Sequence, residues 1–317
     1  MTWLRNRDID DERPKRERPE DEDIDPARRL CHRDEVTKGN RSRGAVTRRI
    51  AKGRFMAESD RPRSPFAGLD FSAQHAVRAL PYDEIERLLA AHRLYVETER
   101  RQGRRADFGS ADLSGVHFAG LNLRRVKMDR AVLRGADLTG AHLERANLIG
   151  AVLEEARLDN ADLSRARLSG ANLASASLVN ACLTQADMEF ALMDKAVLRG
   201  ARLEAADMSG AILDAAVLTR ADLRAVNLRG AGFRDARLDE ADLRGARLGG
   251  AFLIGASLRD ADLRGAYVRL AKFDGADLSG ANLDEVVGLT QAQFDRVRWD
   301  NRTRLPKGVR GMADNER

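Results

Sequence analysis

The sequence is poor in the features that identify membrane proteins, disulfide-rich proteins and globular domains with aromatic cores. Aromatic side chains make up only 5% of the 317 residues. The sequence contains no run of about 18 apolar residues, so no membrane-spanning helix is expected, and the N-terminus lacks the apolar core of a signal peptide. The two cysteines, Cys31 and Cys182, lie far apart, so a disulfide framework is not expected. We therefore expect a reduced, cytoplasmic protein of bacterial type.

Motifs for catalysis or cofactor binding are missing as well. The sequence holds no GxSxG, no P-loop, no Cys/His cluster and no paired nucleophile and base. His117 and His142 fall in different units of the repeat described below, and His92 is expected to be a packed residue rather than a metal ligand. Cys182 is expected to be a tolerated surface thiol. We predict a non-enzymatic protein with no catalytic residue, no cofactor and no metal site.

The dominant feature of the sequence is a five-residue repeat. From Ala106 to Glu285 an apolar residue recurs at every fifth position, and a second apolar residue follows two places after it, through 36 units. The first is Ala in 32 units and the second is Leu in 27. A period of five is neither the 3.6 of a helix nor the 2 of a strand. It indicates a stacked repeat in which each unit buries the same two side chains.

One unit, ADLRG at residues 241–245, illustrates how the repeat folds. In an extended chain Ala241 and Leu243 point to one side and Asp242 points to the other. If Arg244 and Gly245 form a corner, the next unit begins a new side with its own Ala and Leu facing inward. Glycine is common at the fifth position, where a corner needs unusual torsion angles. Successive coils then pair in parallel.

This A(D/N)LxG pattern resembles the pentapeptide-repeat family, and the resemblance covers residues 106–285 completely. It implies an all-β solenoid, a right-handed quadrilateral parallel β-helix with four units per coil. The 180 repeat residues would then form about nine coils. The resemblance also implies an N-terminal helical cap and a short C-terminal helical cap. The number of sides comes from the resemblance, because the five-residue period alone does not fix it.

The N-terminal third of the chain divides into two segments. Residues 1–65 are rich in charge and poor in apolar side chains, which predicts a disordered, charged arm. Residues 66–105 predict a helical segment that caps the solenoid, with its helix running from Asp83 to Arg101. Acidic residues fill the first turn of this helix, Arg100 and Arg101 fill the last, and Gly103 follows.

The repeat occupies residues 106–285, and residues 286–317 are interpreted as the C-terminal cap and tail. Thr290 and Gln293 form a capping-box pattern at the start of a short helix. Phe294, Val297 and Trp299 are expected to close that mouth of the solenoid.

Only the three outward positions of each unit can carry function. With four units per coil, equivalent positions of every fourth unit stack on one another, so Asp222, Asp242 and Asp262 form one column. Arg224, Arg244 and Arg264 form a second column beside it, in which opposite charges stabilise the wall modestly.

Two surface features are candidates for interaction. The first is an apolar stripe, interrupted by Asn172 and Gly232, which is either a ladder between stacked strands or a partner or dimer patch. The stripe consists of Val132, Val152, Leu192, Ile212 and Phe252. The second is a possible basic patch of Arg124, Arg125, Arg145 and Arg165.

Three functions are compatible with this sequence. The first is a scaffold that mediates protein–protein interaction, with an unknown protein partner; the family resemblance also allows a homodimer through the C-terminal cap. The second is DNA mimicry directed at DNA gyrase, as in some family members. The repeat has a net charge of only −3, whereas duplex DNA carries about one negative charge per 1.7 Å. The third is binding of nucleic acid or another anionic partner by the basic N-terminal arm.

Overall fold

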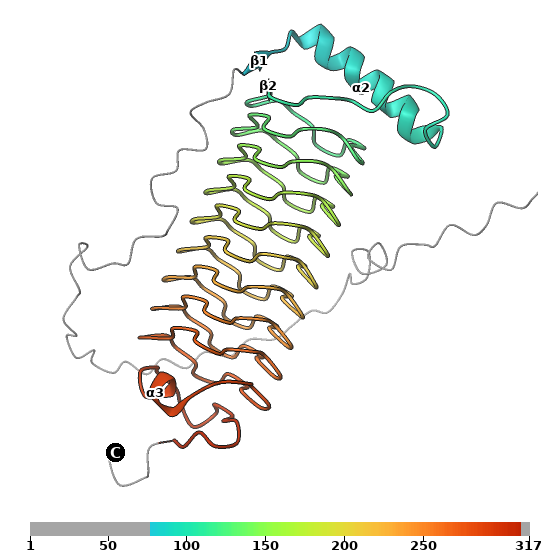
Figure 1. Ribbon diagram of the computed structural model, residues 1–317. Coiled ribbons are helices and arrows are strands. Elements are labelled where there is room, and N and C mark those ends of the chain that lie inside the picture. The colour runs from blue at the N-terminus through green and yellow to red at the C-terminus, as the bar shows by residue number, and fades with distance from the viewer. Residues whose placement is uncertain (1–76, 312–317) are drawn as a thin grey trace, which may run out of the picture.

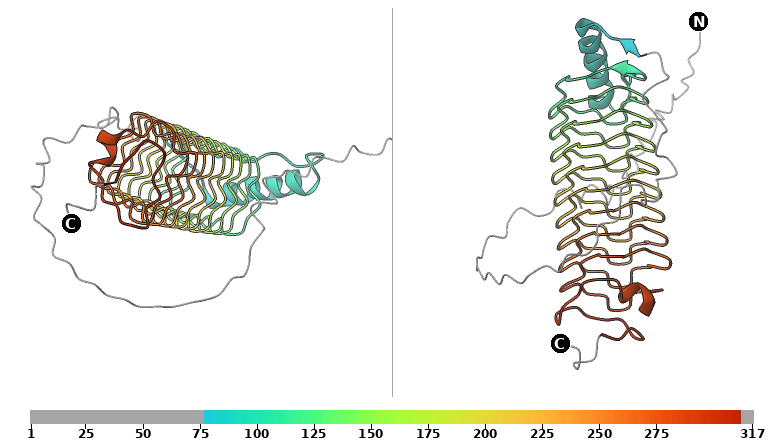
Figure 2. Two further views of the ribbon diagram at one scale, coloured as in Figure 1. Left: turned by 90° about the horizontal axis from the view of Figure 1, so that it is seen from below. Right: turned by 90° about the vertical axis from the view of Figure 1, so that its left-hand side faces the viewer.

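The computed structural model describes residues 77–311, and within that range the chain forms a long stack of coils (Figures 1 and 2). Its named elements are β1 (Arg78–Ala79), α2 (Tyr82–Glu97), β2 (Ala111–Asp112) and α3 (Gln291–Phe294). Strands β1 and β2 pair in parallel. Helix α2 lies across one end of the stack and α3 lies at the other (Figure 1). The predicted arm over residues 1–65 lies outside the described residues.

The coils are joined by parallel bridges between equivalent residues of every fourth unit. The bridges run from the pair Asp107–Lys127 to the pair Tyr267–Val287 without a change of register. At each bridge the second residue of a unit donates its N–H to the coil before, as in Val132 N to Ala111 O at 2.9 Å. The third residue donates to the coil after, as in Leu133 N to Val152 O at 2.7 Å. The bridged residues are therefore 20 positions apart, a spacing of four five-residue units, which the sequence period alone could not establish.

The inside of the stack is filled by the first and third residue of each unit. Every third residue is at most 3% exposed, and so is every first residue except Val116 and Leu121 near the N-terminal end. Small Ala and larger Leu side chains alternate along the inner face, so adjacent sides pack closely without aromatic residues. The predicted inward register is confirmed.

The corners between sides lie at the fourth and fifth residues. The turn at 243–246 is closed by a hydrogen bond from Ala246 N to Leu243 O at 3.0 Å. All 36 fifth residues have a positive φ, and Gly245, with a φ of 67°, is one of fifteen glycines among them. The other twenty-one corners hold residues with a side chain in the left-handed region, where a Cβ meets the following carbonyl oxygen unfavourably.

Helix α2 is shorter than the sequence predicts, because it ends at Glu97 and not at Arg101. The hydroxyl of Thr98 donates to Leu94 O at 2.6 Å and accepts from Gln102 N at 2.9 Å. Glu99 and Arg100 then adopt positive φ values of 51° and 74°. Thr98 thus competes for the backbone groups of the last turn and folds the chain back. Arg100 and Arg101 consequently lie beyond the helix.

His92 connects α2 to the start of the repeat. Its side chain is 1% exposed, and its Nδ1 accepts a hydrogen bond from Ala106 N at 3.1 Å. Burial, and next the charge of Arg105, lowers the pKa of His92 to about 4. His92 is therefore a neutral, packed residue at neutral pH, as predicted from the sequence.

The C-terminal end is built as the capping-box pattern predicts. Gln293 N donates to Thr290 Oγ1 at 3.3 Å, and Thr290 N donates to Gln293 Oε1 at 2.8 Å. Phe294 is 1% exposed, while Val297 and Trp299 pack partly buried against the same apolar core. The bridges extend into this segment, where Asp277 pairs with Arg298 and Asn282 with Arg304.

Candidate functional site

The outer surface of the stack is divided into four walls. Each wall consists of one unit from every coil, because the bridges join every fourth unit. We number the walls by their first units, which begin at residues 106, 111, 116 and 121. The apolar stripe lies on the second wall, and the columns of Asp and Arg lie on the fourth.

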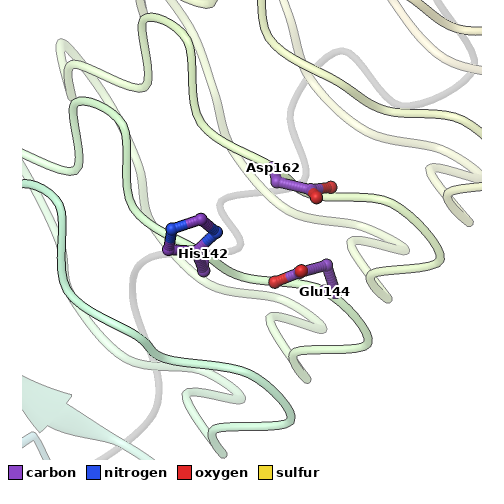
Figure 3. A group of neighbouring side chains, drawn as sticks. All are labelled: His142, Glu144 and Asp162. Atoms are coloured by element: carbon purple, nitrogen blue, oxygen red, sulfur yellow. The ribbon is translucent and has the colours of Figure 1, made fainter. Parts of the chain in front are cut away.

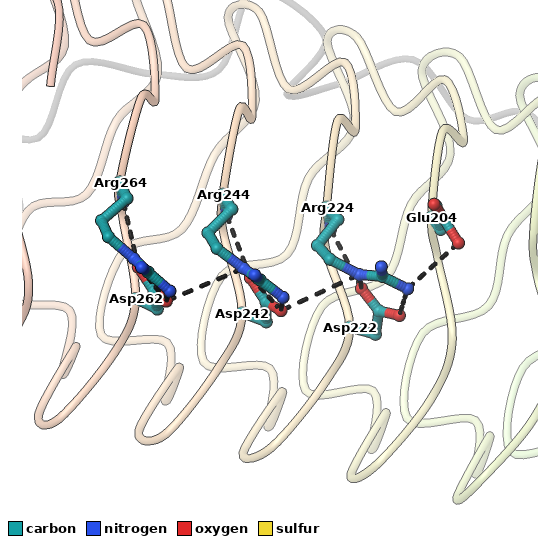
Figure 4. A network of polar contacts seen from close by, with 7 residues as sticks. All are labelled: Glu204, Asp222, Arg224, Asp242, Arg244, Asp262 and Arg264. Carbon is teal, nitrogen blue, oxygen red and sulfur yellow. Dashed lines mark hydrogen bonds and ion pairs between the residues drawn. The ribbon is translucent and has the colours of Figure 1, made fainter. Parts of the chain in front are cut away.

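The fourth wall carries a continuous ladder of ion pairs over four coils (Figure 4). Arg244 Nη2 lies 2.6 Å from Oδ2 of Asp242 in its own unit. Its Nε lies 3.7 Å from Oδ2 of Asp262 in the next coil. Arg224 repeats this arrangement and also reaches Glu204 Oε2 at 3.1 Å. The predicted columns are confirmed, and each carboxylate lies between two guanidinium groups or beside one.

The ladder neutralises its own charge. Burial alone would raise the pKa of Asp262, but hydrogen bonds from Arg264 and the charges of Arg264 and Arg244 lower it below its usual range. The carboxylate of Asp262 is thus held ionised by neighbouring cations. A surface of alternating charge does not reproduce the continuous negative charge of a nucleic acid backbone.

The apolar stripe forms one column on the second wall. Parallel bridges join Val132 to Val152 and Leu192 to Ile212. Asn172 lies between these two pairs, and Gly232 lies between Ile212 and Phe252. Val152 is 7% exposed, and the other four members are intermediate in exposure. Each side chain is therefore partly covered by its neighbours in adjacent coils, as in a ladder between stacked strands.

Phe252, at the C-terminal end of the stripe, lies against cations. Lys272 Nζ is 4.9 Å from the centre of its ring, and Arg234 Cζ is 5.6 Å away. Arg234 also pairs with Asp214 at 3.3 Å. The ring of Phe252 attracts these cations through cation–π interactions, so this end of the stripe has both apolar and charged groups.

The four arginines of the predicted basic patch fall into two groups. Arg124 is at a fourth position and donates from Nε and Nη2 to Glu144 Oε1 at 2.8 and 2.6 Å. Arg125, Arg145 and Arg165 are at fifth positions, stacked along one corner with φ values of 57° to 61°. Arg165 Nε donates to Gln185 Oε1 at 2.9 Å. The structure therefore places one member in an ion pair within the wall and three along its edge.

Cys182 differs from its predicted state. It is only 4% exposed, and its Sγ lies 3.5 Å from Thr184 Oγ1. The expectation of a surface thiol is therefore wrong. An outward position in this fold is still flanked by the coils above and below, so a small side chain there can be buried.

Sequence reasoning missed one cluster of polar residues, His142, Glu144 and Asp162 on the fourth wall (Figure 3). Each offers a ligand-type atom, and these atoms lie within 4.8 Å of one another. Among residues 77–311 it is the one group of three or more such side chains. A signal was present in the sequence, because His142 and Asp162 occupy the same position of stacked units and Glu144 belongs to the unit of His142.

The family of the chain follows from a comparison with protein-family models. The model described as pentapeptide repeats matches eight times, over residues 104–140, 127–165, 153–189, 181–220, 196–235, 216–253, 236–274 and 253–287. The chain belongs to the pentapeptide-repeat family. No curated protein gives a significant match.

Several solved pentapeptide-repeat structures are similar to the chain. HetL from the cyanobacterium Nostoc sp. strain PCC 7120, involved in heterocyst differentiation regulation, is 28% identical, with 73% of this chain and 96% of HetL covered and a TM-score of 0.34. A protein from the Arabidopsis thaliana thylakoid lumen is 32% identical, with 31% and 67% covered and a TM-score of 0.30. QnrB1, a plasmid-mediated fluoroquinolone resistance protein, is 21% identical, with 60% and 94% covered and a TM-score of 0.24.

The helices between residues 77 and 311 are short. Within residues 77–311, none is long and apolar enough to cross a membrane.

Proposed function

We propose that this pentapeptide-repeat protein is a non-enzymatic scaffold whose second wall binds a protein partner. The observation that carries the proposal is the contrast between the walls. Over the coils that carry Glu204 to Arg264, the fourth wall pairs its charges internally through the Asp and Arg ladder. On the second wall the bridged column is apolar instead, and four of its five members are partly exposed, beside Asp194 and the ion pair of Asp214 with Arg234.

Site-specific photo-crosslinking tests this assignment. A photo-crosslinking amino acid at Ile212 samples the second wall, and the same group at Val217 samples the third wall of the same coil. Both positions are half-exposed second residues of their units. We expect the Ile212 probe to form a crosslink to one protein band in cells and the Val217 probe to form none. Equal crosslinking at both positions would contradict a wall-specific interface.

The finer fold is part of the proposal. We propose a right-handed, four-sided β-helix of about nine coils, with α2 and α3 acting as its caps. Support comes from the bridges between every fourth unit and from the burial of Phe294 beside the last coils. A crystal structure would establish the handedness and the number of sides directly.

A homodimer through the C-terminal end is the second partner that we propose. Tyr267, Leu270 and Val287 are 52%, 74% and 49% exposed, and Tyr267 bridges directly to Val287. Exposed apolar groups close together favour an interface. We expect Leu270→Arg to convert a dimer into a monomer in light scattering. The matched variant Leu94→Arg, on exposed α2 at the other end, should leave the mass unchanged.

The N-terminal arm and the cellular location stay predictions. Deletion of residues 1–65 would abolish a salt-sensitive interaction with nucleic acid if the arm binds anions. Cell fractionation of the full chain would test the cytoplasmic location.

A further inference from the structure

His142, Glu144 and Asp162 converge from two consecutive coils of the fourth wall. His142 and Glu144 belong to the unit 141–145, and Asp162 belongs to the unit stacked directly on it in the next coil (Figure 3). A parallel bridge joins His142 to Asp162 and fixes the distance between the two coils. The convergence therefore depends on backbone register and not on a flexible loop.

In each carboxylate of the cluster, one oxygen accepts hydrogen bonds and the other has no hydrogen-bond partner. Asp162 Oδ1 accepts from Ser164 N at 3.0 Å and from Ser164 Oγ at 2.6 Å. Glu144 Oε1 accepts both hydrogen bonds from Arg124. Asp162 Oδ2 and Glu144 Oε2 are buried and have no hydrogen-bond partner among the described residues. Metal-binding carboxylates are commonly oriented in this way by outer hydrogen bonds.

The burial of these oxygens is extensive. Asp162 is only 7% exposed, and the side chain of Glu144 is 14% exposed. Burial raises the pKa of Asp162, hydrogen bonds from Ser164 lower it, and the charge of Glu144 raises it again. The pKa of Asp162 therefore stays above its usual value. For Glu144, burial opposes ionisation but the hydrogen bonds from Arg124 lower its pKa. Two buried carboxyl groups this close together are stabilised by a cation between them or by a proton that one of them keeps.

We propose that His142, Glu144 and Asp162 bind a divalent first-row transition metal ion, with zinc as the representative ion. The imidazole nitrogen supplies a ligand that magnesium and calcium seldom use, and carboxylate oxygens complete a nitrogen and oxygen set suited to zinc. With both carboxylates ionised and Arg124 retained, the group carries one net negative charge before the ion binds. The ion would fasten two neighbouring coils together.

The geometry requires a small closure. The ligand atoms lie within 4.8 Å of one another, whereas two ligands in a tetrahedral zinc site are roughly 3.4 Å apart. His142 is half-exposed and can turn toward the carboxylates, which are fixed by Ser164 and Arg124. Three protein ligands would leave a fourth position for water.

Isothermal titration of the full chain with zinc chloride at neutral pH tests the proposal. We expect one zinc ion to bind, and tenfold or greater weakening in each of the variants His142→Gln and Asp162→Asn. The matched control is His117→Gln, because His117 also faces an aspartate one coil away, with Nδ1 3.9 Å from Asp137 Oδ2, but its side chain is 85% exposed. This control should bind zinc like the parent protein.

Thermal unfolding supplies a second readout. Zinc should raise the Tm of the parent protein and of His117→Gln, and should leave the Tm of Asp162→Asn unchanged. Absence of zinc binding by the parent protein would overturn the proposal, and so would equal binding by the parent and by both ligand variants. If zinc does not bind and Asp162→Asn raises the Tm at neutral pH, the two carboxyl groups share a proton in place of a metal ion.

Discussion

The corner residues provide a quantitative test of the fold, because their backbone conformation is independent of residue type. Ala215 is at a fifth position with a φ of 58°, and its side chain is exposed. The left-handed conformation costs a residue with a Cβ about 1–2 kcal/mol. Glycine avoids this cost but loses roughly 0.5–1 kcal/mol more through the freedom of the unfolded chain. Ala215→Gly is therefore expected to stabilise the protein by roughly 0.5–1 kcal/mol.

Two matched variants isolate the backbone effect. Gly245→Ala makes the reverse change at another corner, where a Cβ would meet no atom within 4 Å. It should destabilise by about the same amount, since only the torsion angle opposes it. Ala174→Gly changes the same residue type at a fourth position, which is not among the residues of positive φ. There glycine should cost roughly 0.5–1 kcal/mol.

Urea unfolding monitored by circular dichroism measures all three variants. For a structured region of this size, 1 kcal/mol corresponds to about 2–4 °C in Tm, so thermal scans give a second estimate. A decrease in stability for Ala215→Gly as large as that for Ala174→Gly would refute the reasoning. Such a result would mean that the fifth residues do not adopt the left-handed conformation in solution.

Three further predictions follow from the core, the N-terminal helix and the surface charge. Leu203→Asp should unfold several coils because Leu203 is 0% exposed, whereas Arg244→Ala should cost about 1 kcal/mol or less at a half-exposed ion pair; equal melting temperatures would contradict the inward register. In the folded protein the pKa of His92 is about 4. Between pH 6.5 and 4 only the unfolded chain gains the proton, so the stability should fall by up to about 3 kcal/mol as the pH falls. Hydrogen exchange of α2 at the two pH values measures this loss, and His92→Gln should abolish the pH dependence. Because the acidic columns are neutralised by arginines, the protein should neither inhibit nor protect DNA gyrase in a supercoiling assay.

The inward-facing positions could be predicted from the sequence because burial requires an apolar residue at the first and third position within each unit. Ala241 and Leu243 are buried for the same reason in every unit, so repetition reinforces the pattern. The capping box at Thr290 and Gln293 was equally local. The end of α2 was not, because the hydroxyl of Thr98 competes with the charges of Arg100 and Arg101 for the last turn.

The outward half depends on the number of units per coil, which the five-residue period leaves open. Once four units are known to complete a coil, Asp242 and Asp262 are stacked, and their pairing with Arg244 follows. The cluster around Asp162 needed more information. The cluster exists because Ser164 and Arg124 donate to only one oxygen of Asp162 and of Glu144, respectively. The repeat period does not specify which side-chain oxygen accepts these hydrogen bonds.

The fourth wall shows how one backbone supports different chemistry at equivalent positions. In the coil of Arg244 the second and fourth residues are Asp and Arg, so the carboxylate is paired within its own unit. In the coil of Glu144 they are His and Glu, and the arginine that pairs with Glu144 comes from the preceding coil, which leaves Oε2 facing Asp162 unpartnered. The exchange of acid and base between the second and fourth positions thus converts a neutral ladder into a cluster that needs a cation. Function in this protein should accordingly be sought where the outward pattern of a unit departs from that of the units stacked on either side of it.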